Sequence, residues 1–343
     1  MTTYYVTTSG SDSNNGLTEG TAFATPGYAA SQATTAGDVI YIKEGTYTIS
    51  TASSNVSNGV MSVTAGVLIE GYKTTAGDKA AKPLLTSTVT GTLTNNFMIL
   101  MNNVDRNLGY YGYIDSVEVN GGSSGFTYGI QVGVHQIAAF NCKASNTYYG
   151  ISGKAYFCEA YNCTQGFISA YCYGCYSEGC TSLGYNTCSV INCIAYDNYR
   201  GAYFNNNFVS GFVAHSSTEY GAYFVSNRDY APPYRNLIAI NSGTYGLAGI
   251  QNAQPIYNFA GYNNTSGNFE FSSSNWLINE ITLTADPFTD PANGDWSLNS
   301  DAGGGELLKS VSEVMPFGTN YNDVNAFQRQ VTAGGGNVIV IED

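Results

Sequence analysis

Cysteine is the most concentrated reactive residue type in this chain of 343 residues, because all eight cysteines lie between positions 142 and 193. Three pairs share the spacing Cys-x4-Cys and two cysteines stand apart from them: Cys158/Cys163, Cys175/Cys180 and Cys188/Cys193, then Cys142 and Cys172. Three interpretations compete: a disulfide framework, which needs an oxidising compartment; a zinc site, which needs a second pair beside Cys172-x2-Cys175; and a column of buried thiols. We favour the buried column, which predicts reduced cysteines and no bound metal.

The Cys-x4-Cys spacing also carries a geometric prediction. Successive side chains of a strand point to opposite faces, so two residues five apart on a straight strand point to opposite sides. If both thiols of a pair face the core, the chain must turn a corner between them. The spacing therefore predicts one corner within each pair.

Acidic residues about one repeat apart are candidates for glycan cleavage. Glycoside hydrolysis needs two carboxyl groups roughly 5 to 9.5 Å apart. Adjacent coils could supply such a pair from Glu159 with Glu178, or from Asp197 with Glu219. The competing interpretation is that all four are solvated turn residues. We expect no catalytic residue and keep these four acids as candidates; His215, one of two histidines, is expected to be packed rather than a general base.

Tyrosine is the positive feature of the surface chemistry, with 29 copies in the chain. Its ring is apolar and its tip is polar, which suits recognition surfaces and interfaces. Such residues could stack on sugar rings or pack against a sister subunit, and they could equally be ordinary outward-facing residues of strands. The predicted ligand-binding residues are Tyr173, Tyr196, Tyr203 and Tyr223.

A repeat of about 20 residues must position these side chains. A glycine followed by an apolar or small residue recurs through the middle of the chain: Gly129, Gly150, Gly166, Gly184, Gly201, Gly221 and Gly246, with a weaker copy at Gly267. A second marker runs beside it: Asn141-Cys142, Asn162-Cys163, Gly179-Cys180, Asn192-Cys193 and Asn241-Ser242. A ragged period of this length is typical of a solenoid of short strands, whose turns absorb extra residues.

The repeat predicts an all-β fold, a single-stranded right-handed parallel β-helix with a short N-terminal capping helix. The residues between the glycines are β-formers, and no capped helical stripe interrupts them. The glycines fit corners, where the backbone takes positive φ or crowds the next coil. An antiparallel sandwich is the alternative, and sparse Asn-Gly hairpin signals argue against it.

Composition indicates one domain spanning residues 1–343, with a cap at 1–37, coils at 38–300 and a C-terminal tail or cap at 301–343. The formal net charge of −13 disfavours nucleic acid and anionic membranes as partners, and it makes strongly anionic polysaccharides awkward ligands. No apolar run is long enough to span a membrane, and the first residues lack the features of a secretory signal. We therefore expect synthesis in a host cytoplasm and a final location in a virus particle.

The first fifty residues contain a sequence pattern that resembles one found in known proteins. Gly10-Ser11-Asp12-Ser13-Asn14-Asn15-Gly16 is followed by Phe23-Ala24-Thr25-Pro26, an alanine-rich stretch, and Gly37-Asp38-Val39-Ile40-Tyr41-Ile42. This resembles the N-terminal cap and first coil of right-handed parallel β-helix proteins of the pectate-lyase-like superfamily. The resemblance implies a helix over about 26–36 that plugs the open end of the coil.

The C-terminal part resembles bacterial and viral members of that superfamily. Asp286-Pro287-Phe288 with Asp295-Trp296-Ser297-Leu298 is similar to their terminal coil, and Asp323-Val324-Asn325-Ala326-Phe327-Gln328-Arg329 resembles a tail that follows it. The likeness is specific for fold and weak for activity, because this fold hosts lyases, hydrolases, adhesins and phage tailspikes.

The catalytic motifs of the superfamily are incomplete here. The nearest match to the Arg-x-Pro-x-x-Arg motif of pectate lyases ends at Arg235, but Tyr230 stands where the first arginine belongs, so this segment is interpreted as an inserted turn. The Asn-Thr-Asp, Asp-Asp and Gly-His-Gly elements of polygalacturonases are missing. We expect a non-enzymatic virion protein, a fibre, spike or capsid decoration that binds a host-surface glycan or a virion partner, without a cofactor and as a homo-oligomer, most simply a trimer. The alternative is a polysaccharide lyase or glycoside hydrolase.

Overall fold

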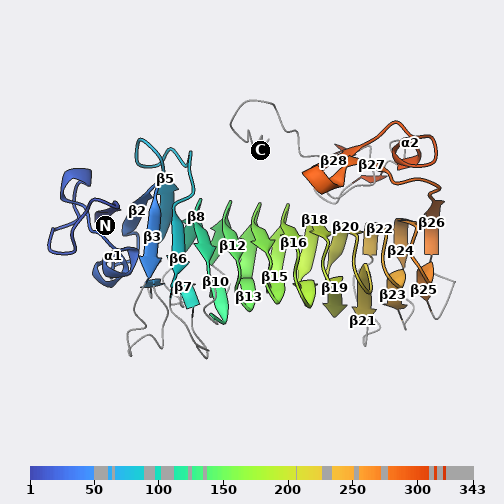
Figure 1. Ribbon diagram of the computed structural model, residues 1–343, viewed down its shortest axis with the longest axis horizontal. Coiled ribbons are helices and arrows are strands. Elements are labelled where there is room, and N and C mark those ends of the chain that lie inside the picture. The colour runs from blue at the N-terminus through green and yellow to red at the C-terminus, as the bar shows by residue number, and fades with distance from the viewer. Residues whose placement is uncertain are drawn as a thin grey trace.

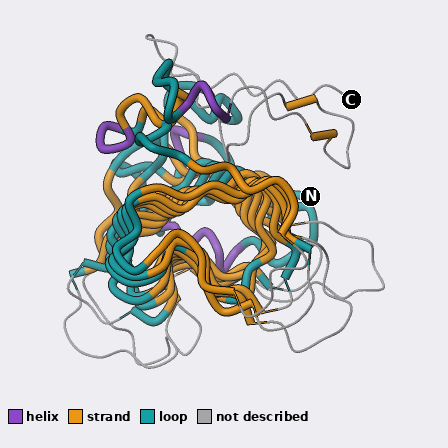
Figure 2. The backbone as a smooth tube through the Cα atoms, turned by 90° about the vertical axis from the view of Figure 1, so that its right-hand side faces the viewer, coloured by secondary structure: helices purple, strands orange, loops and turns teal. Residues whose placement is uncertain are grey.

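Successive turns of the chain stack into a parallel β-helix whose strands form one 26-stranded sheet (Figure 1). The computed structural model describes residues 1–49, 61–63, 66–88, 97–101, 112–122, 126–133, 137–205, 207–225, 234–250, 255–271, 277–308, 313–314 and 320–321. Viewed along the axis, the strands of successive coils superpose on three walls around a filled core (Figure 2). The predicted fold class is confirmed.

The three walls are named faces A, B and C, and every strand pairs in parallel with strands of the coils above and below. Face A contains β1 (Thr3–Val6), β2 (Val39–Lys43), β5 (Leu68–Tyr72), β8 (Gly112–Asp115), β11 (Ile137–Phe140), the ends of β13 (Tyr149–Tyr156) and β15 (Gln165–Tyr173), and the beginnings of β18 (Ser189–Tyr196), β20 (Val209–His215), β22 (Tyr234–Ile240), β24 (Ile256–Tyr262) and β26 (Leu277–Thr282).

Face B follows face A in each coil. It contains β3 (Thr46–Ile49), β6 (Leu84–Ser87), β9 (Glu118–Asn120), β12 (Lys143–Ser145), β14 (Glu159–Tyr161), β16 (Tyr176–Glu178) and the ends of β18, β20, β22, β24 and β26. Face C contains β4 (Met61–Val63), β7 (Phe97–Met101), β10 (Tyr128–Val132), the beginnings of β13 and β15, then β17 (Leu183–Asn186), β19 (Arg200–Asn205), β21 (Ala222–Val225), β23 (Tyr245–Ile250) and β25 (Gly267–Phe271).

Residues in the left-handed conformation turn the chain at two of the corners. The A–B corner holds Ser116, Asn141, Phe157, Gly174, Asn192, Gly211, Asn236, Asn258 and Asn279, and the B–C corner holds Asn146, Asn162, Gly179, Asp197, Ser216, Asn241 and Asn263. Asparagine tolerates this conformation and its amide bonds to the next coil: Asn258 Nδ2 donates to Asn236 Oδ1 at 3.1 Å. The Asn-Cys marker of the sequence analysis therefore grouped residues from two different corners. Asn141 and Asn192 lie at the A–B corner, and the other copies lie at the B–C corner.

The thiols line the core in columns. Cys142, Cys158, Cys175 and Cys193 each follow a left-handed residue of the A–B corner, and all eight cysteines are buried and free. In the pair Cys158/Cys163 the corner residue Asn162 lies between two inward-facing thiols, as the spacing predicts. No group of metal-binding side chains suited to an ion occurs among the described residues.

The repeated glycines stack at the start of face C. A Cβ atom on Gly150 would lie 2.6 Å from the carbonyl oxygen of Gly166, and one on Gly201 would lie 2.1 Å from that of Gly221. Close approach of the next coil, rather than positive φ, therefore requires these glycines. The weak eighth copy was misplaced, since Gly246 meets the carbonyl oxygen of Asn268 and not Gly267.

The N-terminal end of the core is closed by α1 (Pro26–Gln32), preceded by η1 (Glu19–Thr21). Pro26 takes the first helical position, and the Thr25 side chain accepts a hydrogen bond from the Tyr28 amide at 3.3 Å. The helix ends at Gln32, four residues before the predicted end at 36. The cap also contributes β1, whose pairing with β2 starts the sheet before residue 38.

The C-terminal unit comprises residues 283–308 and lies outside the coils (Figure 1). It contains β27 (Phe288–Asp290), η2 (Pro291–Asn293), β28 (Asp295–Leu298) and α2 (Gly305–Leu308); β29 (Glu313–Val314) and β30 (Asn320–Tyr321) follow it. The parallel sheet ends at Thr282, so the prediction of coils to residue 300 is wrong: β27 and β28 pair antiparallel. The unit instead packs its apolar residues on the outer side of face B in a second core. The tail motif at 323–329 lies outside the described residues.

Among the described residues, no helix has the length and apolarity that crossing a membrane requires.

Candidate functional site

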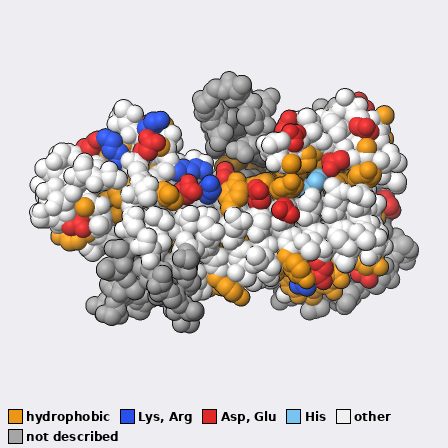
Figure 3. Space-filling model, viewed as in Figure 1, with side chains coloured by type: hydrophobic (Ala, Val, Ile, Leu, Met, Phe, Trp, Pro, Cys, Tyr) orange, Lys and Arg blue, Asp and Glu red, His pale blue; other side chains and the backbone are white. Residues whose placement is uncertain are grey.

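Charged and aromatic side chains follow the outer side of face B from coil to coil. Strand pairing places Glu118, Lys143, Glu159 and Tyr176 in one outward column, and Tyr161 and Glu178 in the column beside it. Together with Lys82 these residues define the face B strip. All are half-buried; Lys82 lies just before β6, and the other six lie on strands whose neighbouring positions point into the core. Figure 3 shows charged side chains along this middle part of the molecule, before the C-terminal unit begins.

Two adjacent strands of the strip carry a crossed arrangement of acids and tyrosines. Glu159 of β14 lies level with Tyr176 of β16, while Tyr161 lies level with Glu178. Each tyrosine donates its hydroxyl to the acid of its own strand: Tyr161 to Glu159 Oε2 at 3.0 Å, and Tyr176 to Glu178 Oε2 at 2.8 Å. We call these four residues the quartet. Burial and then the Glu178 contacts raise the pKa of Tyr176 well above its usual range, so its hydroxyl stays protonated.

The two lysines of the strip are balanced by its glutamates. Lys143 Nζ lies 3.4 Å from Glu118 and 4.9 Å from the centre of the Tyr161 ring, and Lys82 Nζ lies 4.0 Å from Glu159 Oε1. No basic group among the described residues pairs with Glu178. The strip therefore alternates hydrogen-bond donors and acceptors and carries one acid in excess of its lysines.

The C-terminal unit forms a wall at one end of the strip. Trp296 of β28 is buried, with its ring centre 6.3 Å from that of Tyr176 and 5.5 Å from that of Tyr196. The predicted ligand residue Tyr196 is thus partly covered by the unit. His215 lies beside it, edge-on to Trp296 at 5.8 Å.

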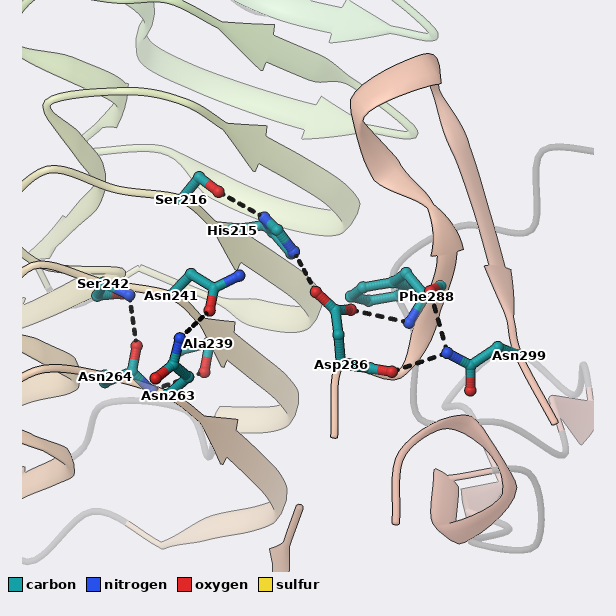
Figure 4. A network of polar contacts seen from close by, with 10 residues as sticks. All are labelled: His215, Ser216, Ala239, Asn241, Ser242, Asn263, Asn264, Asp286, Phe288 and Asn299. Atoms are coloured by element: carbon teal, nitrogen blue, oxygen red, sulfur yellow. Dashed lines mark hydrogen bonds and ion pairs between the residues drawn. The ribbon is translucent and has the colours of Figure 1, made fainter. Parts of the chain in front are cut away.

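His215 joins the solenoid to the unit, and Figure 4 shows its ring pointing at Asp286. Its Nε2 lies 2.8 Å from Asp286 Oδ2 and its Nδ1 lies 2.9 Å from Ser216 Oγ. The other Asp286 oxygen accepts from the Phe288 amide, and Asn299 Nδ2 donates to the backbone carbonyl of Asp286. His215 is 4% exposed, which confirms a packed histidine.

A second cluster of side chains lies on face C and at its corner with face B. It contains Tyr199, Arg200, Tyr203, Glu219, Tyr220 and Tyr223, and is called the tyrosine patch. Tyr203 and Tyr223 stack in parallel with ring centres 6.0 Å apart, and Tyr220 lies 5.4 Å from Tyr223. Arg200 Nε lies 2.5 Å from Glu219 Oε2 and the guanidinium lies over the exposed ring of Tyr199.

The predicted site residues are therefore divided among the faces. Glu159 and Glu178 come together on face B, with Tyr196 at the rim, while Tyr203, Tyr223 and Glu219 come together on face C. Asp197 and Glu219 do not form a carboxylate pair: Asp197 is a corner residue with φ 49°, and Glu219 is paired with Arg200. Tyr173 lies on face A, apart from both of these groups, and is edge-on to Phe157 at 5.4 Å.

Sequence reasoning missed the lysines of the strip and a network on face A. A signal existed for Lys143, because it lies one coil after its ion-pair partner Glu118 and one 16-residue coil before Glu159. Lys82 pairs with Glu159 far along the chain, and no period connects these two residues. On face A, Lys79 Nζ lies 2.6 Å from Asp115 Oδ2 and 3.9 Å from Glu70, whose carboxylate also accepts the Tyr113 hydroxyl. Glu70 and Asp115 pair in register across 45 residues, a separation with no period to reveal it.

Comparison with known proteins supports the fold alone. No protein-family model matches the chain, and a search of curated proteins finds no match. Among solved structures, a rhamnogalacturonan lyase is similar with a TM-score of 0.51 at 16% identity, covering 90% of this chain and 96% of the lyase. The pectate lyase Pel9A is similar with a TM-score of 0.51 at 15% identity, covering 96% of each chain. The chain thus has the parallel β-helix fold of pectate-lyase-like proteins, as the sequence resemblance implies.

Proposed function

We propose that this protein binds a glycan along the face B strip without cleaving it, as an adhesion or structural component of a virus particle. The observation that carries the proposal is the alternation of acceptors and donors at successive coils: Glu118, Lys143, Glu159 and the tyrosine hydroxyls. A sugar hydroxyl both donates and accepts, so this spacing suits a hydroxyl-rich chain that runs along the solenoid axis.

The quartet argues for binding rather than cleavage. General acid catalysis requires a carboxyl group that is protonated near neutral pH, which proteins achieve by an apolar site or an adjacent like charge. Here Glu159 and Glu178 each accept a tyrosine hydroxyl through one oxygen, so both carboxyl groups are held in place as hydrogen-bond acceptors. Groups held in this way are suited to accept hydrogen bonds from the hydroxyls of a sugar.

The experiment that tests this function is a glycan array followed by calorimetry. The purified protein should bind at least one glycan, and incubation with that glycan should release neither reducing ends nor unsaturated products. Tyr161→Ala should weaken binding about tenfold, since it removes a ring and a hydroxyl together. Tyr173→Ala on face A is the matched control and should leave the affinity unchanged.

Glycoside hydrolysis at the quartet is the second candidate function. It is favoured by the placement of Glu159 and Glu178 on adjacent strands of one face, offset by two residues. From the strand rise and the coil spacing their Cα atoms are about 8 Å apart. Reducing ends released by the wild type and abolished by Glu178→Gln would establish this function in place of the first.

The tyrosine patch is proposed as a second contact surface, for a glycan or for a sister subunit. Tyrosine and arginine are enriched where proteins recognise partners, and Tyr199 presents an exposed ring there. Its stacked residues Tyr203 and Tyr223 turn their ring faces toward each other, which leaves edges and hydroxyls for a partner. We propose a homotrimer, or attachment to a larger particle, and light scattering that finds a monodisperse monomer with no particle partner would contradict it.

A further inference from the structure

We infer that the glycan held by the face B strip is a neutral, hydroxyl-rich chain, and that polyanionic glycans such as uronates are excluded. The inference rests on the proposed function of the strip and adds the chemical class of its ligand. It depends on how the charges of the strip are already paired.

Every cation of the strip has an acidic partner on the strip. Lys143 is held between Glu118 and the face of Tyr161, and Lys82 lies beside Glu159. A uronate carboxylate that approached either lysine would have to compete with a glutamate that is anchored on a strand. The strip therefore offers no lysine with unbalanced charge to an anionic sugar.

The acids on successive coils of the strip repel an anionic chain that lies along the solenoid axis. Glu178 has no basic partner among the described residues and lies one coil beyond Glu159. A polyanion laid along the axis meets a new coil about every 4.8 Å, so successive carboxylates could not avoid both glutamates. At this range charges are weakly screened by salt, because the Debye length is about 8 Å at physiological ionic strength. The net charge of −13 adds repulsion at longer range.

A neutral sugar is not repelled by these acids and can form hydrogen bonds with them. Its hydroxyls can donate to the second oxygens of Glu159 and Glu178, whose Oε2 atoms are held by tyrosine hydroxyls, and can accept from Lys143. Hydrogen bonds to charged groups are the stronger class, and none of these requires an existing ion pair to break. The same groups that repel a uronate therefore bind a hexose.

The test compares neutral and anionic hexamers on one protein. The probes are hexamers of glucose, mannose and galactose against hexamers of galacturonate and mannuronate, measured by calorimetry at 50 and 200 mM NaCl. A neutral hexamer should bind with little salt dependence, and each anionic hexamer should bind at least about tenfold more weakly. Glu178→Lys should raise the affinity for an anionic hexamer about tenfold or more, with a salt dependence that the wild type lacks.

Glu44→Lys is the matched control, because Glu44 is exposed near the N-terminal end and gives the same change in net charge. Glu44→Lys should leave the preference for neutral over anionic hexamers unchanged. An equal gain in affinity for an anionic hexamer in Glu44→Lys and Glu178→Lys would overturn the inference. Wild-type protein that binds anionic hexamers as well as neutral ones would overturn the inference and leave the proposed function standing. Binding to no glycan by the folded protein would overturn both.

Discussion

His215 lies 2.8 Å through its Nε2 atom from Oδ2 of Asp286, a residue 71 positions later in the chain. The contact sits inside the second core, where the rings of Phe288 and Trp296 lie 6.2 and 5.8 Å from the histidine ring. An apolar interface holds the C-terminal unit on face B, and this polar contact fixes its position.

Removing either partner should therefore loosen the unit. His215→Ala and Asp286→Ala are each expected to reduce the stability of docking by about 1.5 to 3 kcal/mol, the range for hydrogen bonds that involve a charged group. Faster proteolysis within residues 283–308, with a change in tryptophan fluorescence, is the measurement. Asp290→Ala is the control, because Asp290 bonds to Asn293 inside the unit. Equal sensitivity of all three variants would show that the contact does not fix the unit.

Because the thiols are buried, we expect them to react little with thiol reagents in the folded protein, and we expect the stability of the fold to fall at alkaline pH. Burial raises the pKa of Cys142 and Cys158 well above the ordinary value of 9.0, so they stay protonated and unreactive in the folded protein. Thiol titration at pH 8 should find almost none in the native state and eight after denaturation without reductant. A count below eight would indicate disulfides.

The sign of the pH effect follows from the same shift. Above pH 9 the unfolded state loses thiol protons that the folded state keeps, so the unfolded state binds fewer protons and stability falls as pH rises. Cys142 and Cys158 should each cost about 1.4 kcal/mol per pH unit in that range. Urea unfolding at pH 8 and pH 10 measures the difference, and equal midpoints would contradict it.

Periodic features were readable from the sequence because each coil repeats one environment. The Cys158/Cys163 spacing predicted a corner between two inward thiols, and Asn162 provides it. Contacts without a period were not readable: the packing of Trp296 on Tyr176 depends on where a separate unit docks, and the docking surface becomes visible only after the coils are assembled. The Asn-Cys dipeptides of the two corners could not be told apart in the sequence, since both corners use a left-handed residue followed by a buried one.

The glycine column should tolerate no side chain. Gly201→Ala would place a Cβ atom 2.1 Å from the Gly221 carbonyl oxygen, so two coils must separate locally. We expect a loss of about 1 to 3 kcal/mol, the usual cost of overpacking. Chemical denaturation measures it. Gly20→Ala is the control, because its Cβ would meet nothing nearer than 4.0 Å. Equal stability of the two variants would contradict close coil packing as the reason for the column.

Glu280 should keep the open end of the solenoid from associating. Strand pairing places it in the inward column after Phe212, Leu237 and Phe259, and it is exposed on the last coil. A charge at an inward position of an edge strand opposes pairing with another chain. Glu280→Leu extends the apolar column to the end and should raise concentration-dependent association. Glu270 of the preceding strand β25 points outward, so Glu270→Leu should not raise association. Light scattering across a dilution series measures the association of both variants.

The carboxylates of the quartet should contribute to binding and to no reaction. Glu159→Gln and Glu178→Gln keep the shape of the side chain and replace one carboxyl acceptor by an amide group, so each should weaken glycan binding about tenfold or more, the value of one charge-assisted hydrogen bond. Glu44→Gln should leave binding unchanged, because Glu44 is exposed and lies outside the strip. Reducing ends and absorbance from unsaturated products should stay at background for wild type and variants alike, since both carboxyl groups serve as acceptors for tyrosine hydroxyls in the proposed binding role. Product formed by the wild type and lost in either glutamine variant would make the quartet an active site and the binding interpretation wrong.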